Sequence, residues 1–204
     1  MDGESTSTIK LRWRIVDGQL PLRERHLRSL EPLELTPPLL AWIRSRLEWA
    51  VDNLLTSETN EVLCLTINPA EDVVVSLEPL REIPYLTSED LLCSAGYITG
   101  IQYEDERLDA TVWLEYDGAL HASTIELTTA VDTLARDLAK TLGEELNVAP
   151  VVEYAIRKAK AAFVLSNEFG LLPLKLSSQS DQTTGAPLTT KLTECIAKVL
   201  PVSL

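Results

Sequence analysis

The chain has 204 residues, 45% of them hydrophobic, which suits one mid-sized domain or two small lobes. Three widely spaced cysteines argue against a disulfide framework and favour a reducing compartment, so we expect a cytoplasmic protein. No apolar run approaches the ~20 residues that span a bilayer. The polar N-terminus also lacks the apolar segment of a secretory signal, so no membrane association is expected.

The net charge of −13 is distributed unevenly along the chain. Residues 10–47 carry eight bases against four acids, whereas residues 52–148 carry twenty acids against four bases. Residues 149–204 have a balance of +2. The acidic centre would repel a phosphate backbone, so nucleic-acid binding, restricted to the basic N-terminal segment, is the least favoured hypothesis.

The first elements after an expected disordered tail over residues 1–9 are a strand and a short helix. Residues 11–20 alternate well enough for a strand that meets a turn at Asp17-Gly18, where both residue types tolerate positive φ. A short basic helix is expected over residues 22–30, followed by a linker to Thr36.

The clearest helix begins at Thr36-Pro37-Pro38, because threonine can cap a helix and proline is tolerated in its first turn. An apolar stripe at helical spacing follows, made of Leu39, Ile43, Leu47, Val51 and Leu54. Trp42 and Trp49, seven residues apart, widen that face. The pattern predicts a core helix, with a partner-binding face that uses the two indoles as the alternative.

Two apolar strands are expected next, over residues 61–67 and 72–77, both central and buried. Residues 87–90 resemble a capping box, which predicts a short helix containing Leu91 and Leu92. The remaining expected elements are strands over 101–103, 110–116 and 119–127, a helix capped by Thr128 or Thr129 and ended by Gly143, a helix from Pro150 to Gly170, and a last helix ended by Pro201.

The strands are grouped in hairpins instead of alternating with helices. This favours an α+β fold with a mostly antiparallel sheet packed by four to five helices. Residues 10–204 are expected to form a single α+β domain, with two lobes, 10–85 and 86–204, as the alternative. The pattern Trp-x-x-x-Asp-Gly-x-Leu occurs at Trp13 and again at Trp113. Hairpin chemistry accounts for this echo, and a duplicated hairpin–helix unit is the alternative.

Sequence motifs for catalysis or metal binding are absent. There is no CxxC, GxSxG, GxGxxG or P-loop, and His26 and His121 are not at metal-ligand spacing. The nearest titratable cluster consists of Glu115, Tyr116, Asp117 and His121. Because side chains alternate along a strand, Glu115 and Tyr116 are expected on opposite faces. We therefore predict no catalytic residues, no metal site and no cofactor, and an enzyme with a dispersed site is kept as an alternative.

Residues 16–30, VDGQLPLRERHLRSL, resemble the small lobe of class IV pyridoxal-phosphate aminotransferases. In that family a strand that ends in a glycine turn leads to a helix with a His-Leu-x-x-Leu pattern, followed by a second helix and two strands. The resemblance covers residues 11–85. It implies a cofactor held as a Schiff base by a lysine of the large lobe. No lysine lies between Lys10 and Lys140, and Lys140, Lys158 and Lys160 fall in expected helices, so the resemblance implies a degenerate relative without catalysis.

The main functional prediction is a non-catalytic binding, assembly or regulatory protein. Its segregated basic and acidic regions would steer and orient another protein, or a second copy of the same chain. The predicted contact residues are Arg23, Arg25, Arg28, Trp42 and Trp49.

Overall fold

The computed structural model describes residues 8–33, 35–68, 72–123, 129–176 and 187–201. The chain divides into two compact units, residues 1–81 (unit 1) and 82–204 (unit 2), which are described separately. Residues 1–7 of the expected tail lie outside the described residues, and Ile9 already belongs to a strand. No described helix combines the length and the hydropathy that crossing a membrane requires.

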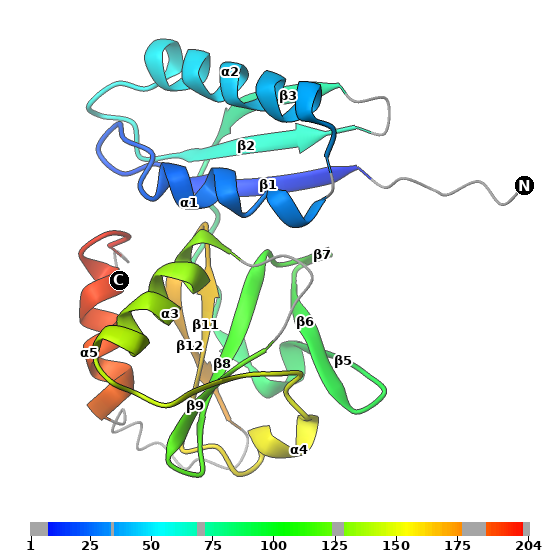
Figure 1. The fold of residues 1–204 in the computed structure, drawn as a ribbon, viewed down its shortest axis with the longest axis vertical. Helices are drawn as coiled ribbons and strands as arrows, with labels where there is room; N and C mark the ends of the chain where they lie inside the picture. Colours follow the sequence, from blue (N-terminus) through cyan, green and yellow to red (C-terminus); the bar gives the residue numbers. More distant parts are fainter. Residues whose placement is uncertain (1–7, 34, 69–71, 124–128, 177–186, 202–204) are drawn as a thin grey trace, which may run out of the picture. The chain divides into compact units, whose positions relative to one another are not determined.

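Unit 1 is a three-stranded antiparallel sheet with helices packed on it (Figure 1). Its elements are β1 (Ile9–Arg14), α1 (Arg23–Arg28), a 3-10 turn (Glu31–Leu33), α2 (Pro37–Leu54), β2 (Val62–Ile67) and β3 (Val73–Glu78). The strand order is β1-β2-β3. The predicted turn is confirmed, because Asp17 and Gly18 have φ of 49° and 72°.

The two helices of unit 1 bury apolar side chains against the sheet. The ring of His26 in α1 stacks on Trp13 of β1, with ring centroids 4.6 Å apart. Helix α2 begins at the predicted position and packs against β3. Its buried face consists of Leu39, Ile43, Leu47 and Ala50.

Strand β3 corrects one expectation. The apolar composition of residues 72–77 predicted a central, buried strand, and only β2 is central. β3 is an edge strand, in which Val73 is buried and Val74 is 45% exposed. Composition alone cannot distinguish these positions, because an edge strand under a helix also contains apolar residues.

Unit 2 contains a six-stranded sheet, a three-stranded sheet and three helices (Figure 1). Its elements are β4 (Leu86–Thr87), a 3-10 turn (Ser88–Asp90), β5 (Leu91–Ser94), β6 (Tyr97–Tyr103), β7 (Glu106–Arg107), β8 (Ala110–Tyr116), β9 (Ala119–Ala122), α3 (Ala130–Thr141), β10 (Leu146–Val148), α4 (Glu153–Ile156), β11 (Ala161–Ser166), β12 (Gly170–Lys175) and α5 (Pro187–Ala197).

The large sheet has the order β10-β9-β8-β11-β12-β4, and the small one β5-β6-β7. Most strand pairs are antiparallel, and the exceptions are β9 with β10 and β12 with β4. Helices α3 and α5 pack on each other and against β11 and β12. The predicted α+β class with mostly antiparallel strands and five helices is confirmed.

Two predicted helices are wrong. The capping box at residues 87–90 is present, but it closes a 3-10 turn, and Leu91 and Leu92 belong to β5. The helix expected from Pro150 to Gly170 is a four-residue helix, α4, followed by β11 and β12. The apolar spacing there suited a helix, yet Phe163 and Val164 favour a strand that is buried on both faces.

Helix α3 is confirmed, with Thr129 as its cap, but a different face is buried. Thr129 accepts a hydrogen bond from the Asp132 backbone N–H. The sequence predicts a stripe of Val131, Leu134, Leu138 and Leu142 on one side of this helix, but Leu142 is 40% exposed. The buried face instead carries small residues, Val131, Ala135 and Ala139, which allow a close approach to the sheet.

Candidate functional site

The predicted arginines lie on α1, where Arg23 contacts an acidic side chain and Arg28 contacts a backbone carbonyl of unit 1. The Arg23 guanidinium lies 3.4 Å from the carboxylate of Glu48 in α2. Arg28 donates a hydrogen bond to the Glu24 carbonyl one turn away. Arg25 is half-buried. The three arginines therefore do not form a continuous exposed basic surface: Arg23 and Arg25 are half-buried, and Arg28 is the most exposed.

The predicted tryptophans are the most prominent apolar groups on the surface of α2. Trp42 is 48% exposed and Trp49 is 50% exposed, so neither indole belongs to the core. The guanidinium of Arg46 lies 5.1 Å from the centre of the Trp42 ring, at the distance of a cation–π contact. Aromatic and arginine side chains in such an arrangement are typical of protein-binding surfaces.

A buried pair of rings lies beneath α1. Trp13 and His26 are almost completely buried. The Trp13 Nε1 and His26 Nδ1 atoms have no hydrogen-bond partner among the residues that the structure describes. Burial lowers the pKa of His26 to about 3, against a smaller opposing effect of a hydrogen bond to the Pro21 backbone. In the sequence, the positive charges of Arg23, Arg25 and Arg28 beside His26 also predict a lowered pKa, but desolvation by burial is the main cause.

A charged cluster lies on the opposite side of the unit 1 sheet from Trp13. Arg12 donates hydrogen bonds to the Glu78 carboxylate and to the Pro79 carbonyl. Burial alone would raise the pKa of Glu78, but hydrogen bonds from Cys64, Arg12 and Lys10 lower it. Burial raises the pKa of the Cys64 thiol to about 12, so this cysteine is not a nucleophile.

Unit 2 contains a buried polar network that sequence reasoning did not find. The Asp132 carboxylate in α3 is completely buried. It accepts hydrogen bonds from Trp113 Nε1 at 2.7 Å and from Thr111 Oγ1 at 3.0 Å, both on β8. Arg136, one turn along α3, pairs with its second oxygen. All three donors therefore converge on one carboxylate, which ties α3 to the sheet.

A second part of this network occupies the N-terminus of α3. The Asn167 side-chain oxygen accepts hydrogen bonds from the N–H groups of Ala130 and Val131, at 2.9 and 3.4 Å. Its side-chain nitrogen donates to the Asp109 carboxylate at 3.1 Å. Burial raises the pKa of Asp109 to about 6, against smaller lowering effects of Asn167 and Arg107.

Only one signal in the sequence could have indicated this network. Thr129 and Asp132 have the three-residue spacing of a capping box, which places Asp132 in the first turn of a helix. Asn167 lies in the turn between β11 and β12, where a helix was expected. Its contact with α3 therefore depends on a strand pairing that the sequence did not predict.

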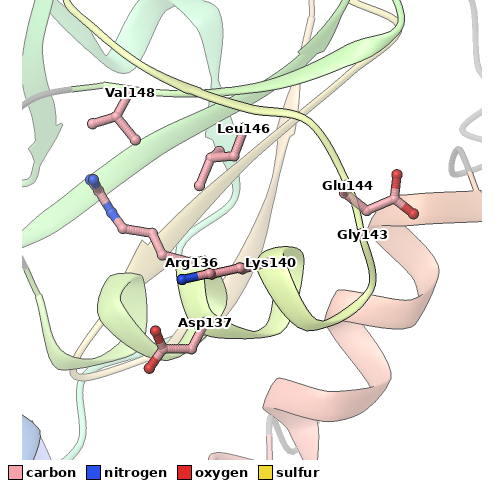
Figure 2. A pocket seen from close by; sticks show the side chains of 7 residues that line it. All are labelled: Arg136, Asp137, Lys140, Gly143, Glu144, Leu146 and Val148. Atoms are coloured by element: carbon pink, nitrogen blue, oxygen red, sulfur yellow. The ribbon is translucent and has the colours of Figure 1, made fainter.

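An open groove of about 560 Å³ lies between α3 and the edge strand β10 in unit 2. Figure 2 shows its lining residues Arg136, Asp137, Lys140, Gly143, Glu144, Leu146 and Val148. In this view the carboxylates of Asp137 and Glu144 point away from each other, and the Arg136 side chain extends toward Val148. The groove thus brings no set of acidic groups together for catalysis or for binding a cation.

The titratable cluster proposed from the sequence is divided by the sheet. Glu115 is buried and its Oε2 atom has no hydrogen-bond partner within the described part of the chain. Tyr116, the next residue on β8, contacts the ring of His121 on β9, with centroids 5.7 Å apart. Adjacent strand residues point to opposite faces, so Glu115 and His121 do not meet. Within the described ranges no group of three or more His, Cys, Asp and Glu could hold a metal.

The family resemblance implies pyridoxal phosphate, which requires a lysine for its Schiff base. Such a lysine has to lie in an enclosed site to exclude water and to lower its pKa. All seven lysines of the chain are exposed: Lys10, Lys140, Lys158, Lys160, Lys175, Lys191 and Lys198. Lys158 and Lys160 were expected in a helix and instead lie between α4 and β11. The lysines present do not fit a Schiff-base site.

The phosphate group would need donors of its own, which a helix N-terminus commonly supplies. In α3 the first N–H groups are bound by Asn167 and Thr129. The buried carboxylate of Asp132 lies in the same turn and would repel a phosphate. The N-terminus of α3 therefore does not fit the phosphate of the implied cofactor either.

No protein-family model and no curated protein matches this sequence. Solved structures do match. One is a hypothetical aminotransferase from Mycobacterium tuberculosis with α-ketoglutarate and PMP bound, at 13% identity and a TM-score of 0.70, covering 97% of this chain and 90% of that chain. Another is the branched-chain amino acid aminotransferase from Escherichia coli, at 11% identity and a TM-score of 0.66, covering 97% and 86%.

A third similar structure is 4-amino-4-deoxychorismate lyase from Pseudomonas aeruginosa. It has 16% identity and a TM-score of 0.65, and the match covers 94% of this chain and 90% of that chain. At these identities the likeness establishes the fold alone. The fold is that of the class IV aminotransferases, and the match extends well beyond residues 11–85, where the sequence resemblance lay.

Proposed function

We propose that this chain is a non-catalytic binding protein that keeps a class IV aminotransferase-like fold without the cofactor chemistry of its structural neighbours. The observation that carries the proposal is the exposure of all seven lysines. A lysine in water has a pKa near 10.4 and stays protonated at neutral pH, so it is a poor nucleophile toward an aldehyde.

The environment of α3 supports the same proposal. The network of Asp132, Thr111 and Trp113 is fully hydrogen-bonded and buried, so it acts as a structural element of the interior. Asn167 takes up helix donors that a phosphate would otherwise use. A return to cofactor binding would require several coordinated changes in this region.

The binding role rests on the surface of unit 1. Trp42 and Trp49 are half-exposed on one helix, with Arg46 between them in sequence and in contact with the first indole. Arg23, Arg25 and Arg28 lie on the neighbouring helix α1. Rigid aromatic groups next to arginines are the residue types that most often dominate the affinity of protein interfaces.

The cofactor part of the proposal is tested by adding pyridoxal phosphate to the purified chain and reducing the mixture with borohydride. We expect no lysine to be labelled stoichiometrically, and only slow, even labelling of exposed lysines at high cofactor concentration. Stoichiometric labelling of one lysine, mapped by peptide mass spectrometry, would contradict the proposal. An aminotransferase treated in parallel is the positive control.

A further inference from the structure

One arginine of α3 is anchored at its inner end and lines the open groove of unit 2. The Arg136 Nε–H donates to the Oδ2 atom of Asp132, 2.5 Å away and one turn earlier on the helix. The Asp132 carboxylate is completely buried, whereas 25% of the Arg136 side chain is exposed. The two Nη nitrogens of Arg136 make no further hydrogen bond with the residues that the structure describes. These outer nitrogens are therefore available to a ligand.

The buried network under α3 fixes the position of this arginine. The Oδ1 atom of Asp132 accepts hydrogen bonds from Thr111 and Trp113 of β8, so the carboxylate cannot turn to follow a moving side chain. A guanidinium held at its Nε end presents its two Nη groups as a planar fork, which matches the two oxygens of a carboxylate. Because the fork is already positioned, binding an anion costs little side-chain entropy.

A second cation lines the groove one turn further along α3 (Figure 2). Lys140 follows Arg136 by four residues, a spacing that places both side chains on the same face of the helix. Lys140 is exposed, and an ammonium group on its flexible stem can move toward an anion that Arg136 holds. The α3 side of the groove therefore supplies one fixed and one mobile positive charge.

The β10 side of the groove is apolar. Leu146 and Val148, two residues apart on β10, both line it, since alternate residues of a strand point to one face of the sheet. Val148 pairs with Ala122 of β9, and Ala122 pairs with Trp113 of β8, whose ring nitrogen donates to Asp132 of α3. The two apolar side chains are thus on the face of the sheet that α3 covers, across the groove from the two cations.

The charges that line the groove favour a ligand with a single negative charge. Arg136 and Lys140 are balanced by Asp137 and Glu144, so the lining has no net charge. In Figure 2 the Arg136 guanidinium and the Glu144 carboxylate lie on opposite sides of the view. A monoanionic head group bound by the two cations is neutralised, whereas a phosphate dianion would add a charge that the acidic lining residues repel.

We propose that this groove binds a small aliphatic carboxylate, with its oxygens bound by Arg136 and Lys140 and its hydrocarbon chain against the apolar side of β10. The groove volume of about 560 Å³ falls in the range of small-molecule sites, roughly 300–1,000 Å³. The site lies wholly in unit 2 and uses no residue of the proposed binding surface of unit 1. It is therefore a second binding function of the chain, beyond the proposed one.

Titration of the full chain with octanoate, followed in proton–nitrogen NMR spectra, tests the proposal. We expect saturable binding with a dissociation constant of roughly 0.1–1 mM, as suits a small ligand on an open surface. The backbone N–H signals of Gly143 and Val148 should shift, and the indole N–H signals of Trp42 and Trp49 should not. Octanamide, which lacks the charge, acetate, which lacks the chain, and inorganic phosphate should each bind at least about tenfold more weakly.

Two groove variants remove the cations, and each has a matched control outside the groove. Arg136→Gln and Lys140→Gln should each weaken octanoate binding at least about fivefold. Arg157→Gln removes another arginine that pairs with an acid four residues earlier, Glu153, and Lys158→Gln removes another lysine of unit 2. Both controls should bind octanoate within about twofold of the wild-type chain. Lys140→Gln leaves the buried network intact, so it tests the site even where Arg136→Gln loosens α3.

Equal affinity for octanoate and octanamide, or octanoate binding that both groove variants leave unchanged, would overturn the proposal. Shifts of the Trp42 and Trp49 signals in place of those at Gly143 and Val148 would also overturn it, because the ligand would then occupy unit 1. Tighter binding of a leucine-terminated peptide with a free C-terminal carboxylate would reassign the groove to the end of a polypeptide. None of these readouts depends on cofactor labelling, so failure of this proposal is distinguishable from failure of the proposed function.

Discussion

His26 is a histidine kept in its neutral form inside unit 1. Burial lowers its pKa from 6.5 to about 3, and its ring stacks on Trp13. Above pH 6.5 the ring is neutral in both the folded and the unfolded chain. Between pH 6.5 and 3 the unfolded chain binds a proton that the folded chain does not. The free energy of unfolding should therefore fall with acidification by about 1.4 kcal/mol per pH unit from this residue alone.

Replacing this histidine with phenylalanine keeps a ring over Trp13 and removes the proton. We predict that His26→Phe loses less stability than the wild-type chain between pH 7 and pH 5, measured by urea unfolding at each pH. His121→Phe, at the half-exposed second histidine, is the control for exchanging an imidazole for a phenyl ring. An identical slope in wild type and His26→Phe would show that His26 is not held neutral by burial.

Gly18 and Gly118 offer a matched comparison, since both follow an aspartate in a tight turn and both have positive φ, 72° and 82°. A Cβ atom on Gly18 would lie 2.0 Å from the Thr56 carbonyl oxygen, whereas one on Gly118 would meet nothing within 4 Å. Alanine in the left-handed region costs about 1–2 kcal/mol at either site. We predict a further loss of about 1–3 kcal/mol for Gly18→Ala, from overpacking. Equal losses in the two variants, measured by urea unfolding, would contradict this assignment.

At the scale of elements, helix α3 depends on the carboxylate of Asp132. Asp132→Ala would leave the buried Trp113 Nε1 and Thr111 hydroxyl without their acceptor and Arg136 without its partner. We predict a loss of about 3–5 kcal/mol in the free energy of unfolding, the usual cost of breaking a buried ion pair from one side. Asp137→Ala, at an exposed position of the same helix, should change it by less than about 0.5 kcal/mol. A small effect for Asp132→Ala in thermal or urea unfolding would refute the structural role of this network.

The local patterns of the sequence predicted most elements of unit 1 because each one contains its own signal. The Asp17-Gly18 turn, the proline start of α2 and the apolar run of β2 depend on neighbours in the chain. The segment from residue 150 to residue 170 was wrong because its structure depends on distant pairing. Phe163 in β11 faces Trp113 in β8. A strand that is buried on both faces is apolar throughout, so its apolar residues also match helical spacing, and the sequence pattern does not distinguish the two.

The same holds for the candidate site: residues with a local sequence signal were identified, and residues whose contacts depend on distant segments were not. The sequence predicted a core helix whose apolar face Trp42 and Trp49 widen; α2 does bury one face, but the structure leaves both indoles half-exposed. The sequence did not identify Asp132 or Asn167, whose functions arise only when α3 meets the turn after β11. The role of Trp42 and Trp49 in binding a partner stays a prediction, and so does the role of Arg23, Arg25 and Arg28.

For the molecule as a whole, we propose that the exposure of its lysines distinguishes this chain from a cofactor enzyme of the same fold. We predict that reductive methylation of the native protein modifies all seven lysines at similar rates, because each one is exposed. Cysteine alkylation of the same sample is the internal control for folding. In the folded state an alkylating reagent should modify the exposed Cys93 and leave the buried Cys64 unmodified. One lysine that resists methylation until the chain is unfolded would indicate an enclosed amine and would count against the account.

The class IV aminotransferase-like fold here includes a helix α3 whose first N–H groups are already bound by side chains. Unit 2 fills the N-terminus of α3 with Asn167 and buries a carboxylate beside it. Unit 1 exposes the two indoles of α2, Trp42 and Trp49. We propose binding of a macromolecule as the activity of this chain, because fold alone does not determine function.

The most direct test of the central claim is native mass spectrometry of the chain purified under mild conditions from the cells that produce it. The account predicts the mass of the polypeptide alone, or of its complex with a second polypeptide chain, with no pyridoxal phosphate attached. Stoichiometric co-purification of pyridoxal phosphate, retained on one lysine after borohydride reduction, would contradict it.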